Sequence, residues 1–267
     1  MNRKQYTAIA FALVGAAALS AQAVVAKDLT VAVYSAFTTL DPYDASDTLS
    51  QNVAKSFYEG LFGFDKDMKL VNVLAESYDV SKDGLEYTIK LKQGIKFSDG
   101  EPFNAAAVKA NFDRVTNPEN HLTRYQLYRN IESVEVVDDA TVKFHLKEAF
   151  SAFINQLAHP SGVMICPKTL ALSKKEVAFN PCGTGPYVLE KYNPAEYLVV
   201  KKNPNYWQKG LPKLDSISFR PVLEDATRVA MLRTGEAQFV DVVPPEHVER
   251  LKDCLLYTSQ SPRDKRQ

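Results

Sequence analysis

The stretch YTIKLKQGIKFSDGEPFNA, residues 87–105, decides which class of fold the chain adopts. Within it Tyr87, Ile89 and Leu91 alternate with polar residues. A period of two predicts a β-strand with one buried face. The segment SDGEP at 98–102 has the composition of a turn, so we expect the strand region to end there.

A helix is predicted directly after that turn. Asn104 has the short polar side chain preferred at an N-cap, and Val108, Phe112 and Val115 recur at helical spacing. Similar patterns of both kinds interleave irregularly along the rest of the chain. The predicted fold class is therefore α/β, with mixed α and β elements, rather than a helical bundle or a β-sandwich.

The same two periodicities predict the remaining elements. Strands are expected at 28–35, 77–91, 131–147, 162–165, 187–203, 216–222 and 237–242, three of these segments being hairpins, and helices at 149–159 and 225–236. Another helix is expected to begin at Asp47 or Thr48, with Val53, Phe57 and Leu61 along one apolar face.

The N-terminus is typical of a secretory signal peptide over residues 1–26. Arg3 and Lys4 precede an apolar run at 9–19, and small residues lead up to Ala26. The apolar run is too short for a permanent membrane span. We expect an exported, soluble periplasmic protein, cut after Ala26 or alternatively after Ala23.

The last residues differ in character from what precedes them. The segment CLLYTSQSPRDKRQ, 254–267, has no periodicity, whereas PPEHVERLKD before it reads as the start of a helix. We expect 254–267 to be a non-native tail and the chain to be a fragment.

Charge and cysteine content limit the partners. Residues 27–253 carry 27 basic and 31 acidic side chains, a net charge of about −4, with no basic patch. Nucleic acid is therefore not an expected partner.

The chain has an odd number of cysteines, Cys166, Cys182 and Cys254. Cys166 and Cys182 are either a disulfide or two buried free thiols, since spacing alone cannot place them in reach of each other.

The sequence has no pattern that indicates catalysis. The four histidines lack metal-ligand spacing, no G-x-S-x-G motif occurs, and GTGPY at 183–187 lacks the lysine of a phosphate-binding loop. GTGPY instead predicts a tight chain crossing. We therefore expect no enzymatic activity, no cofactor and no metal site.

A binding role is better supported. RYQLYRN places Tyr125 and Tyr128 three residues apart, flanked by Arg124 and Arg129. Tyrosine offers an apolar face with a polar tip, and arginine can hold a carboxylate with two parallel hydrogen bonds, which suits a peptide-like ligand. The alternative is that the tyrosines cover a core and the arginines are solvated.

The chain resembles the extracytoplasmic solute-binding proteins of peptide and nickel ABC importers. The resemblance lies in an ordered set of motifs: TTLDPYDASD, SFYEGLF, LAESYDVSKDGLEYTIKLKQGIKFSDGEPFNAAAVKANFDRV, PCGTGPY, NPNYWQKGLPKLDSISFRP and RVAMLRTGEAQFVD. Each is weakly specific alone, but together they cover essentially all of residues 28–253. Two stretches, 37–78 and 211–222, look most like the glutathione-binding members.

The family fold is a two-lobed clamp with a smaller subdomain. The resemblance implies that residues 28–62 and 186–253 form a discontinuous first lobe and residues 63–185 the smaller subdomain, with the second lobe missing here. In relatives the loop after Leu40-Asp41-Pro42 approaches the ligand, and the loop holding HLTRYQLY faces the cleft. The implied ligand-binding residues are Ser46, Asp47, Thr48, Arg124, Tyr125, Leu122 and Tyr128.

The resemblance also implies the function. It implies a monomeric periplasmic receptor, not integral to the membrane, that binds a glutathione-like short peptide and delivers it to the permease subunits of an ABC importer. The alternatives are another cargo of the same family (a dipeptide or oligopeptide, a nickel chelate or haem) and, from a different class, an exported hydrolase.

Overall fold

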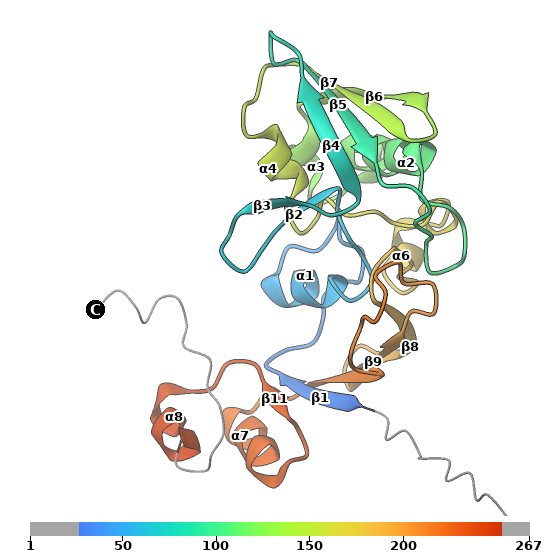
Figure 1. Ribbon diagram of the computed structural model, residues 1–267. Coiled ribbons are helices and arrows are strands. Elements are labelled where there is room, and N and C mark those ends of the chain that lie inside the picture. Colours follow the sequence, from blue (N-terminus) through green and yellow to red (C-terminus); the bar gives the residue numbers. More distant parts are fainter. Residues whose placement is uncertain (1–26, 253–267) are drawn as a thin grey trace, which may run out of the picture.

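Three β-sheets organise the chain in the computed structural model, which describes residues 27–252 (Figure 1). The signal peptide expected at 1–26, the tail expected at 254–267 and Cys254 lie outside the described residues. Strands and helices interleave as the sequence predicts, so the mixed α and β fold is confirmed.

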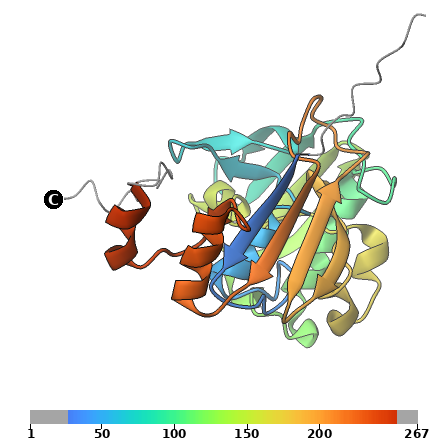
Figure 2. The ribbon, with the colours of Figure 1, turned by 90° about the horizontal axis from the view of Figure 1, so that it is seen from below.

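The largest sheet has five strands in the order β11-β1-β10-β9-β8. Its strands are β1 (Asp28–Val33), β8 (Tyr187–Asn193), β9 (Tyr197–Lys202), β10 (Ser216–Pro221) and β11 (Phe239–Val240). β1 runs parallel to β10 and to β11, and the other pairs are antiparallel. Figure 2 shows β1 beside β10, although most of the chain lies between the two strands in sequence.

The two faces of this sheet pack against different partners. Alternate side chains of a strand point to opposite faces. Val31 and Val33 therefore enter the main hydrophobic core, whereas Ala32 packs with Met231 of α7 (Asp225–Thr234) on the other face. α7 ends at Gly235, whose φ of 79° is the left-handed conformation that glycine adopts most readily.

The second sheet has four antiparallel strands in the order β4-β5-β7-β6. They are β4 (Ala75–Val80), β5 (Glu86–Leu91), β6 (Ile131–Asp138) and β7 (Thr141–Leu146). In β5 the predicted alternation is confirmed, since Tyr87, Ile89 and Leu91 are buried. Helix α2 (Ala105–Thr116) packs on this face, with the Phe112 and Phe144 rings 4.9 Å apart.

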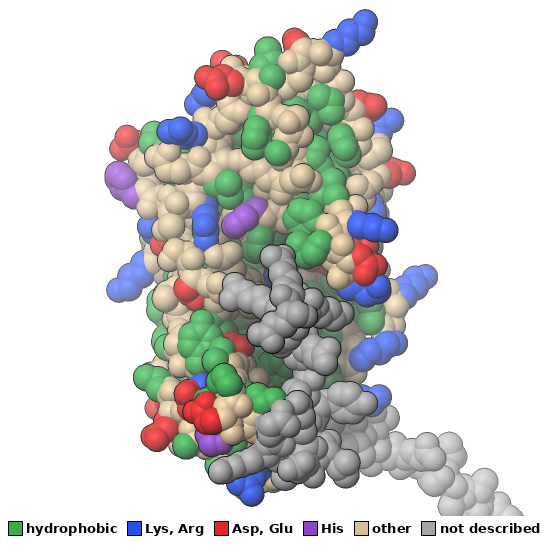
Figure 3. Space-filling model, turned by 90° about the vertical axis from the view of Figure 1, so that its left-hand side faces the viewer, with side chains coloured by type: hydrophobic (Ala, Val, Ile, Leu, Met, Phe, Trp, Pro, Cys, Tyr) green, Lys and Arg blue, Asp and Glu red, His purple; other side chains and the backbone are tan. Residues whose placement is uncertain are grey.

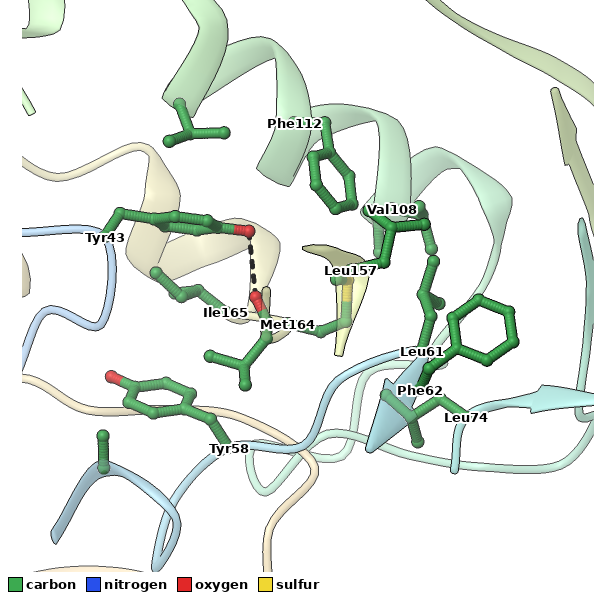
Figure 4. Close-up of a cluster of buried hydrophobic side chains, with 14 of the residues drawn as sticks. Tyr43, Tyr58, Leu61, Phe62, Leu74, Val108, Phe112, Leu157, Met164 and Ile165 are labelled. Atoms are coloured by element: carbon green, nitrogen blue, oxygen red, sulfur yellow. Dashed lines mark hydrogen bonds between the residues drawn. The ribbon is translucent and has the colours of Figure 1, made fainter. Parts of the chain in front are cut away.

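The helix start predicted at Asn104 is also confirmed. The Asn104 side chain accepts a hydrogen bond of 3.0 Å from the backbone of Ala107. Figure 4 shows Val108 and Phe112 of α2 above Tyr43 and Tyr58, in a cluster of buried hydrophobic side chains. The core is therefore shared between the second sheet, α2 and the segments that precede β2.

The remaining elements are short. They are α1 (Thr48–Ala54), β2 (Phe62–Phe64), β3 (Leu70–Asn72), the 3₁₀ helix η1 (Pro118–Asn120), α3 (Tyr125–Tyr128), α4 (Phe153–Leu157), α5 (Pro167–Leu170), α6 (Lys174–Val177) and α8 (Pro245–Lys252). In the described part of the chain, no helix has both the length and the apolar character needed to cross a membrane.

Two predicted elements were wrong. α1 ends at Ala54, so Phe57 and Leu61 are buried beyond the helix rather than on it. The carbonyl oxygen of Phe57 accepts from the backbone of Gly185, a distant residue, instead of continuing the helix. The segment 162–165 is buried but forms only isolated bridges, because its neighbours on both sides are single residues.

The tight chain crossing predicted at GTGPY is confirmed. A Cβ on Gly183 or on Gly185 would lie 2.4 Å from backbone atoms of Phe57. Beside this crossing, Cys166 and Cys182 form a disulfide with a Cα–Cα distance of 5.4 Å, which settles the choice between a disulfide and free thiols. The crossing therefore requires glycine for its lack of a side chain.

A half-buried carboxylate completes the crossing. Glu59 accepts hydrogen bonds from Thr184 Oγ1 at 3.1 Å, Tyr206 OH at 2.9 Å and Trp207 Nε1 at 2.7 Å. Burial raises the pKa of Glu59, and these hydrogen bonds together with the positive charge of Lys92 oppose that rise without cancelling it.

Replacing Gly185 by alanine tests the crossing. We expect a loss of about 3 kcal/mol or more in the free energy of unfolding, because the new methyl group would meet backbone rather than a flexible side chain. Gly63→Ala is the matched control. Its Cβ would meet only the Val73 side chain, at 3.1 Å, so we expect about 1 kcal/mol or less. Equal losses in urea titrations of the two variants would contradict a backbone clash at the crossing.

Substitutions at Glu59 test the carboxylate. Glu59→Ala leaves three partly buried donors unpaired and is expected to lower the free energy of unfolding by about 3 kcal/mol or more, and Glu59→Gln by less. Because the folded-state pKa is raised, its contribution is fully present below the ordinary value of 4.5 and declines as pH rises through the folded pKa. Urea titrations across this range should show the wild type losing stability relative to Glu59→Gln as pH rises. A gap that stays constant would contradict the raised pKa.

Candidate ligand-binding site

The loop 43–48 and the turn 121–125 lie directly against each other, although they are about 79 residues apart in the chain. Three consecutive residues of the loop accept hydrogen bonds from the turn. The Tyr43 carbonyl accepts from Arg124 N at 3.0 Å, Asp44 Oδ1 from Thr123 N at 3.2 Å and Thr123 Oγ1 at 2.9 Å, and the Ala45 carbonyl from Arg124 Nε at 2.9 Å. We call this set of contacts the loop clamp. It brings together the two segments that the sequence nominated for ligand binding.

Arg124 is the partly buried cation of this site. Its Nε donates to the Ala45 carbonyl, whereas its two terminal amino groups have no hydrogen-bond acceptor among the side chains and backbone that the structure describes. A guanidinium held in this way can offer both amino groups to a carboxylate.

His159 lies close enough to sense the charge of Arg124. Burial, followed by the positive charge of Arg124, lowers the pKa of His159. Its Nδ1 accepts from the backbone of Ser161 at 3.1 Å and lies 2.8 Å from the Ser161 hydroxyl. The ring is therefore neutral near pH 7, which leaves Arg124 as the cation of this cluster.

Asp47 caps helix α1. Its Oδ1 accepts from Ser50 N at 2.8 Å and its Oδ2 from Thr38 Oγ1 at 2.5 Å, so the cap is Asp47 and not Thr48. Partial burial raises the pKa of Asp47, but these hydrogen bonds outweigh it and leave the pKa lowered. Ser46 and Thr48, on either side, are exposed and available to a ligand.

Leu122 and Tyr128, which the resemblance also nominated as ligand contacts, have buried side chains. Leu122 is 4% exposed and Tyr128 is 0% exposed. The Tyr128 ring packs edge-on against Tyr43 and Phe112, and its hydroxyl lies 3.1 Å from Ser161 Oγ. Tyr128 therefore belongs to the core, as the alternative interpretation of this motif proposed, whereas Tyr125 remains partly exposed.

Sequence reasoning missed the residues that hold the loop in place. Asp41 is fully buried and forms an ion pair with Arg114 of α2, with Oδ2 and Nη2 2.6 Å apart. Its other oxygen accepts from Tyr43 N at 3.0 Å, and its carbonyl accepts from Asp44 N and Ala45 N. The sequence shows Asp41 in a predicted turn and Arg114 on a predicted helix 73 residues later. Nothing in the sequence indicates that the two side chains pair.

A second missed contact ties the loop to α6. Lys174 Nζ lies 2.9 Å from Asp44 Oδ1 and donates to the His121 carbonyl at 2.8 Å. Partial burial raises the pKa of Asp44, but the hydrogen bonds from Lys174 and Thr123 outweigh that effect, so the pKa is lowered and Asp44 is ionised at neutral pH.

One group among the described residues resembles a metal-ligand cluster. It consists of Asp99, Cys166 and Cys182, and both sulfurs are joined in the disulfide rather than available as thiolates. It therefore does not have the donor set of a thiolate metal site.

The chain is similar to known solute-binding proteins in sequence. Residues 69–263 match the model of the bacterial extracellular solute-binding proteins, family 5. The chain is 64% identical over 229 residues to the glutathione-binding protein GsiB of Salmonella typhi, covering 86% of this chain and 45% of the relative. It is 59% identical over 251 residues to GsiB of Escherichia coli K12, covering 93% and 49%. The chain thus spans about half the length of the curated relatives it matches.

Solved structures share the fold. The periplasmic binding protein DppA of Helicobacter pylori, in complex with the peptide STSA, matches with a TM-score of 0.78 at 26% identity, covering 85% of this chain and 48% of DppA. NikZ of Campylobacter jejuni, in complex with Ni(L-His), matches with a TM-score of 0.75 at 28% identity, covering 85% and 45%.

Removing Arg114 tests the buried ion pair. Arg114→Met leaves the Asp41 carboxylate buried without its partner, so we expect a loss of about 3–5 kcal/mol in the free energy of unfolding. The double variant Asp41→Asn/Arg114→Met removes both charges and should lose less. Arg129→Met, at an exposed arginine, is the control and should change stability by about 0.5 kcal/mol or less. The single variant Asp41→Asn completes the cycle. If the double variant lost as much as Asp41→Asn and Arg114→Met added together, the two residues would not be coupled.

Proposed function

The chain belongs to family 5 of the bacterial extracellular solute-binding proteins, and we propose that the protein carrying it is a periplasmic receptor for glutathione or a similar short peptide. In this proposal the receptor delivers its ligand to the permease subunits of a membrane importer. The observation that carries it is the 64% identity to a glutathione-binding protein over 229 residues.

The geometry of the loop clamp supports a peptide ligand. Glutathione is a tripeptide with two carboxylates and two amide groups. Arg124 offers two amino groups that have no acceptor among the described residues, while Ser46 and Thr48 offer hydroxyls on the exposed side of the loop. Tyr125 adds a partly exposed aromatic ring beside Arg124.

We further propose that the chain supplies one side of a clamp. In this division, residues 28–62 and 186–253 form a first lobe and residues 63–185 a smaller subdomain. It is supported by the five-stranded sheet, which combines β1 with β8–β11, and by the second sheet, which uses only β4–β7. Figure 3 shows one face of the molecule, on which exposed hydrophobic side chains lie among polar ones, as on most protein surfaces. Ligand would be enclosed when the two lobes close about a hinge.

An oligopeptide is the second candidate for the ligand. The DppA structure holds a four-residue peptide and matches this chain with a TM-score of 0.78. NikZ, with a comparable match, holds a nickel–histidine complex. The fold alone therefore does not select the ligand, and the proposal of glutathione depends on the higher identity to GsiB.

Calorimetric titration of the full-length protein tests the ligand. We expect saturable binding of glutathione and none of a dipeptide such as Ala-Ala. Arg124→Ala should weaken glutathione binding by about 10- to 100-fold, because a charge-assisted hydrogen-bonded pair is lost. Arg129→Ala, at an exposed arginine of the same segment, should leave affinity unchanged. If the protein bound the dipeptide but not glutathione, the proposed receptor function would stand and glutathione would be excluded as its ligand.

A further inference from the structure

We propose that Asp44, together with Lys174, is a positioning residue of the binding site, which acts on the ligand only through Arg124. The inference rests on the proposed function, because it concerns the same site. It assigns a role to two residues that are not among the ligand contacts proposed above, although Asp44 lies within the motif TTLDPYDASD.

Asp44 is the central acceptor of the loop clamp. Its Oδ1 atom receives both polar groups of Thr123, the backbone amide at 3.2 Å and the hydroxyl at 2.9 Å. Arg124, the next residue, makes two hydrogen bonds to the residues that flank Asp44. Its backbone amide donates to the Tyr43 carbonyl, and its Nε donates to the Ala45 carbonyl. Asp44 therefore fixes the register between the loop and the turn at the point where Arg124 leaves the turn.

Lys174 extends the contact to a third segment. Its ammonium group lies between Asp44 Oδ1 and the carbonyl of His121, which has a left-handed backbone with φ of 47°. A left-handed backbone is uncommon for a residue other than glycine and needs support from its surroundings. Lys174 begins α6, and Ser173 and Glu176 hold that helix end with a reciprocal capping box. Lys174 thus ties the turn and the loop to the anchored end of a helix.

The consequence concerns the direction of the Arg124 side chain. The Ala45 carbonyl sets this direction through Nε, and the position of Ala45 relative to the turn depends on Asp44. A displacement of about 1 Å is enough to cost a positioned group much of its effect. Asp44 and Lys174 are partly solvated, with 23% and 44% of their side chains exposed, so their ion pair itself should contribute little to global stability. An effect on binding larger than the effect on unfolding would mark a positioning role.

A double-mutant cycle with Arg124 separates positioning from a general structural role. Glutathione is titrated into full-length wild type, Asp44→Ala, Arg124→Ala and the double variant, and the midpoint of thermal unfolding is measured for each. We expect Asp44→Ala to weaken binding by about 10-fold or more and to lower the unfolding midpoint by only a few degrees. In the Arg124→Ala background Asp44→Ala should weaken binding no further, because the residue that it positions is already gone.

Conservative and control variants complete the test. Asp44→Asn keeps an acceptor for Thr123 and should bind within about threefold of wild type. Lys174→Met should weaken binding in the same direction as Asp44→Ala but less, since Thr123 keeps its partner. Asp67→Ala and Lys66→Met remove an exposed ion pair elsewhere, with side chains 56% and 86% exposed, and should leave both affinity and the unfolding midpoint unchanged.

Two outcomes would overturn the inference, and they differ from failure of the proposed function. If Asp44→Ala weakened binding equally with and without Arg124, Asp44 would act on the ligand directly. If it lowered the unfolding midpoint strongly without changing affinity, its role would be structural. A wild-type protein that bound no glutathione would instead reject the proposed ligand.

Discussion

The carboxylate of Glu59 is the interaction on which the rest of the structure depends. It joins three segments that are far apart in the chain, through the side chains of Thr184, Tyr206 and Trp207. The backbone around Glu59 passes under glycines 183 and 185 at distances that leave no room for a Cβ, and its carbonyl accepts from Met164. A carboxylate removed from water must be matched by donors, and here three donors match it at the same point where the backbones cross.

A second buried charge, Asp41, holds the loop 43–48. Asp41 pairs with Arg114 of α2 and accepts from backbone amides of the loop that follows. Asp44 then joins that loop to the turn that carries Arg124. In both contacts hydrogen bonds fix the orientation of a polar side chain, which apolar packing alone would not do. The candidate site lies on two loops, and these contacts hold the loops to α2 and to the capped end of α6.

The candidate site could be predicted only in part. The segments around residues 46–48 and 122–128 were nominated from the family motifs, and the structure places the loop 43–48 against the turn 121–125. Within the second segment, spacing did not separate the two tyrosines. Tyr125 and Tyr128 both lie on α3, but one turn of helix carries Tyr128 into the core between Tyr43 and Phe112 while Tyr125 stays partly exposed. Which face of such a short helix is buried depends on neighbours elsewhere in the chain, so a local pattern cannot decide it.

The sequence by itself determined the class of fold, the alternation that buries Tyr87, Ile89 and Leu91 in β5, the start of α2 at Asn104, and glycine at the GTGPY crossing. These features follow from short-range physics: the side-chain periods of strands and helices, the geometry of a cap and the volume of a Cβ. Only the tertiary structure decided that α1 ends at Ala54, that Cys166 pairs with Cys182, and that Asp41, Asp44 and Glu59 meet Arg114, Lys174 and Trp207. Those partners are set by which distant segments the core brings together, and an aspartate in a turn looks the same in sequence whether it is solvated or paired.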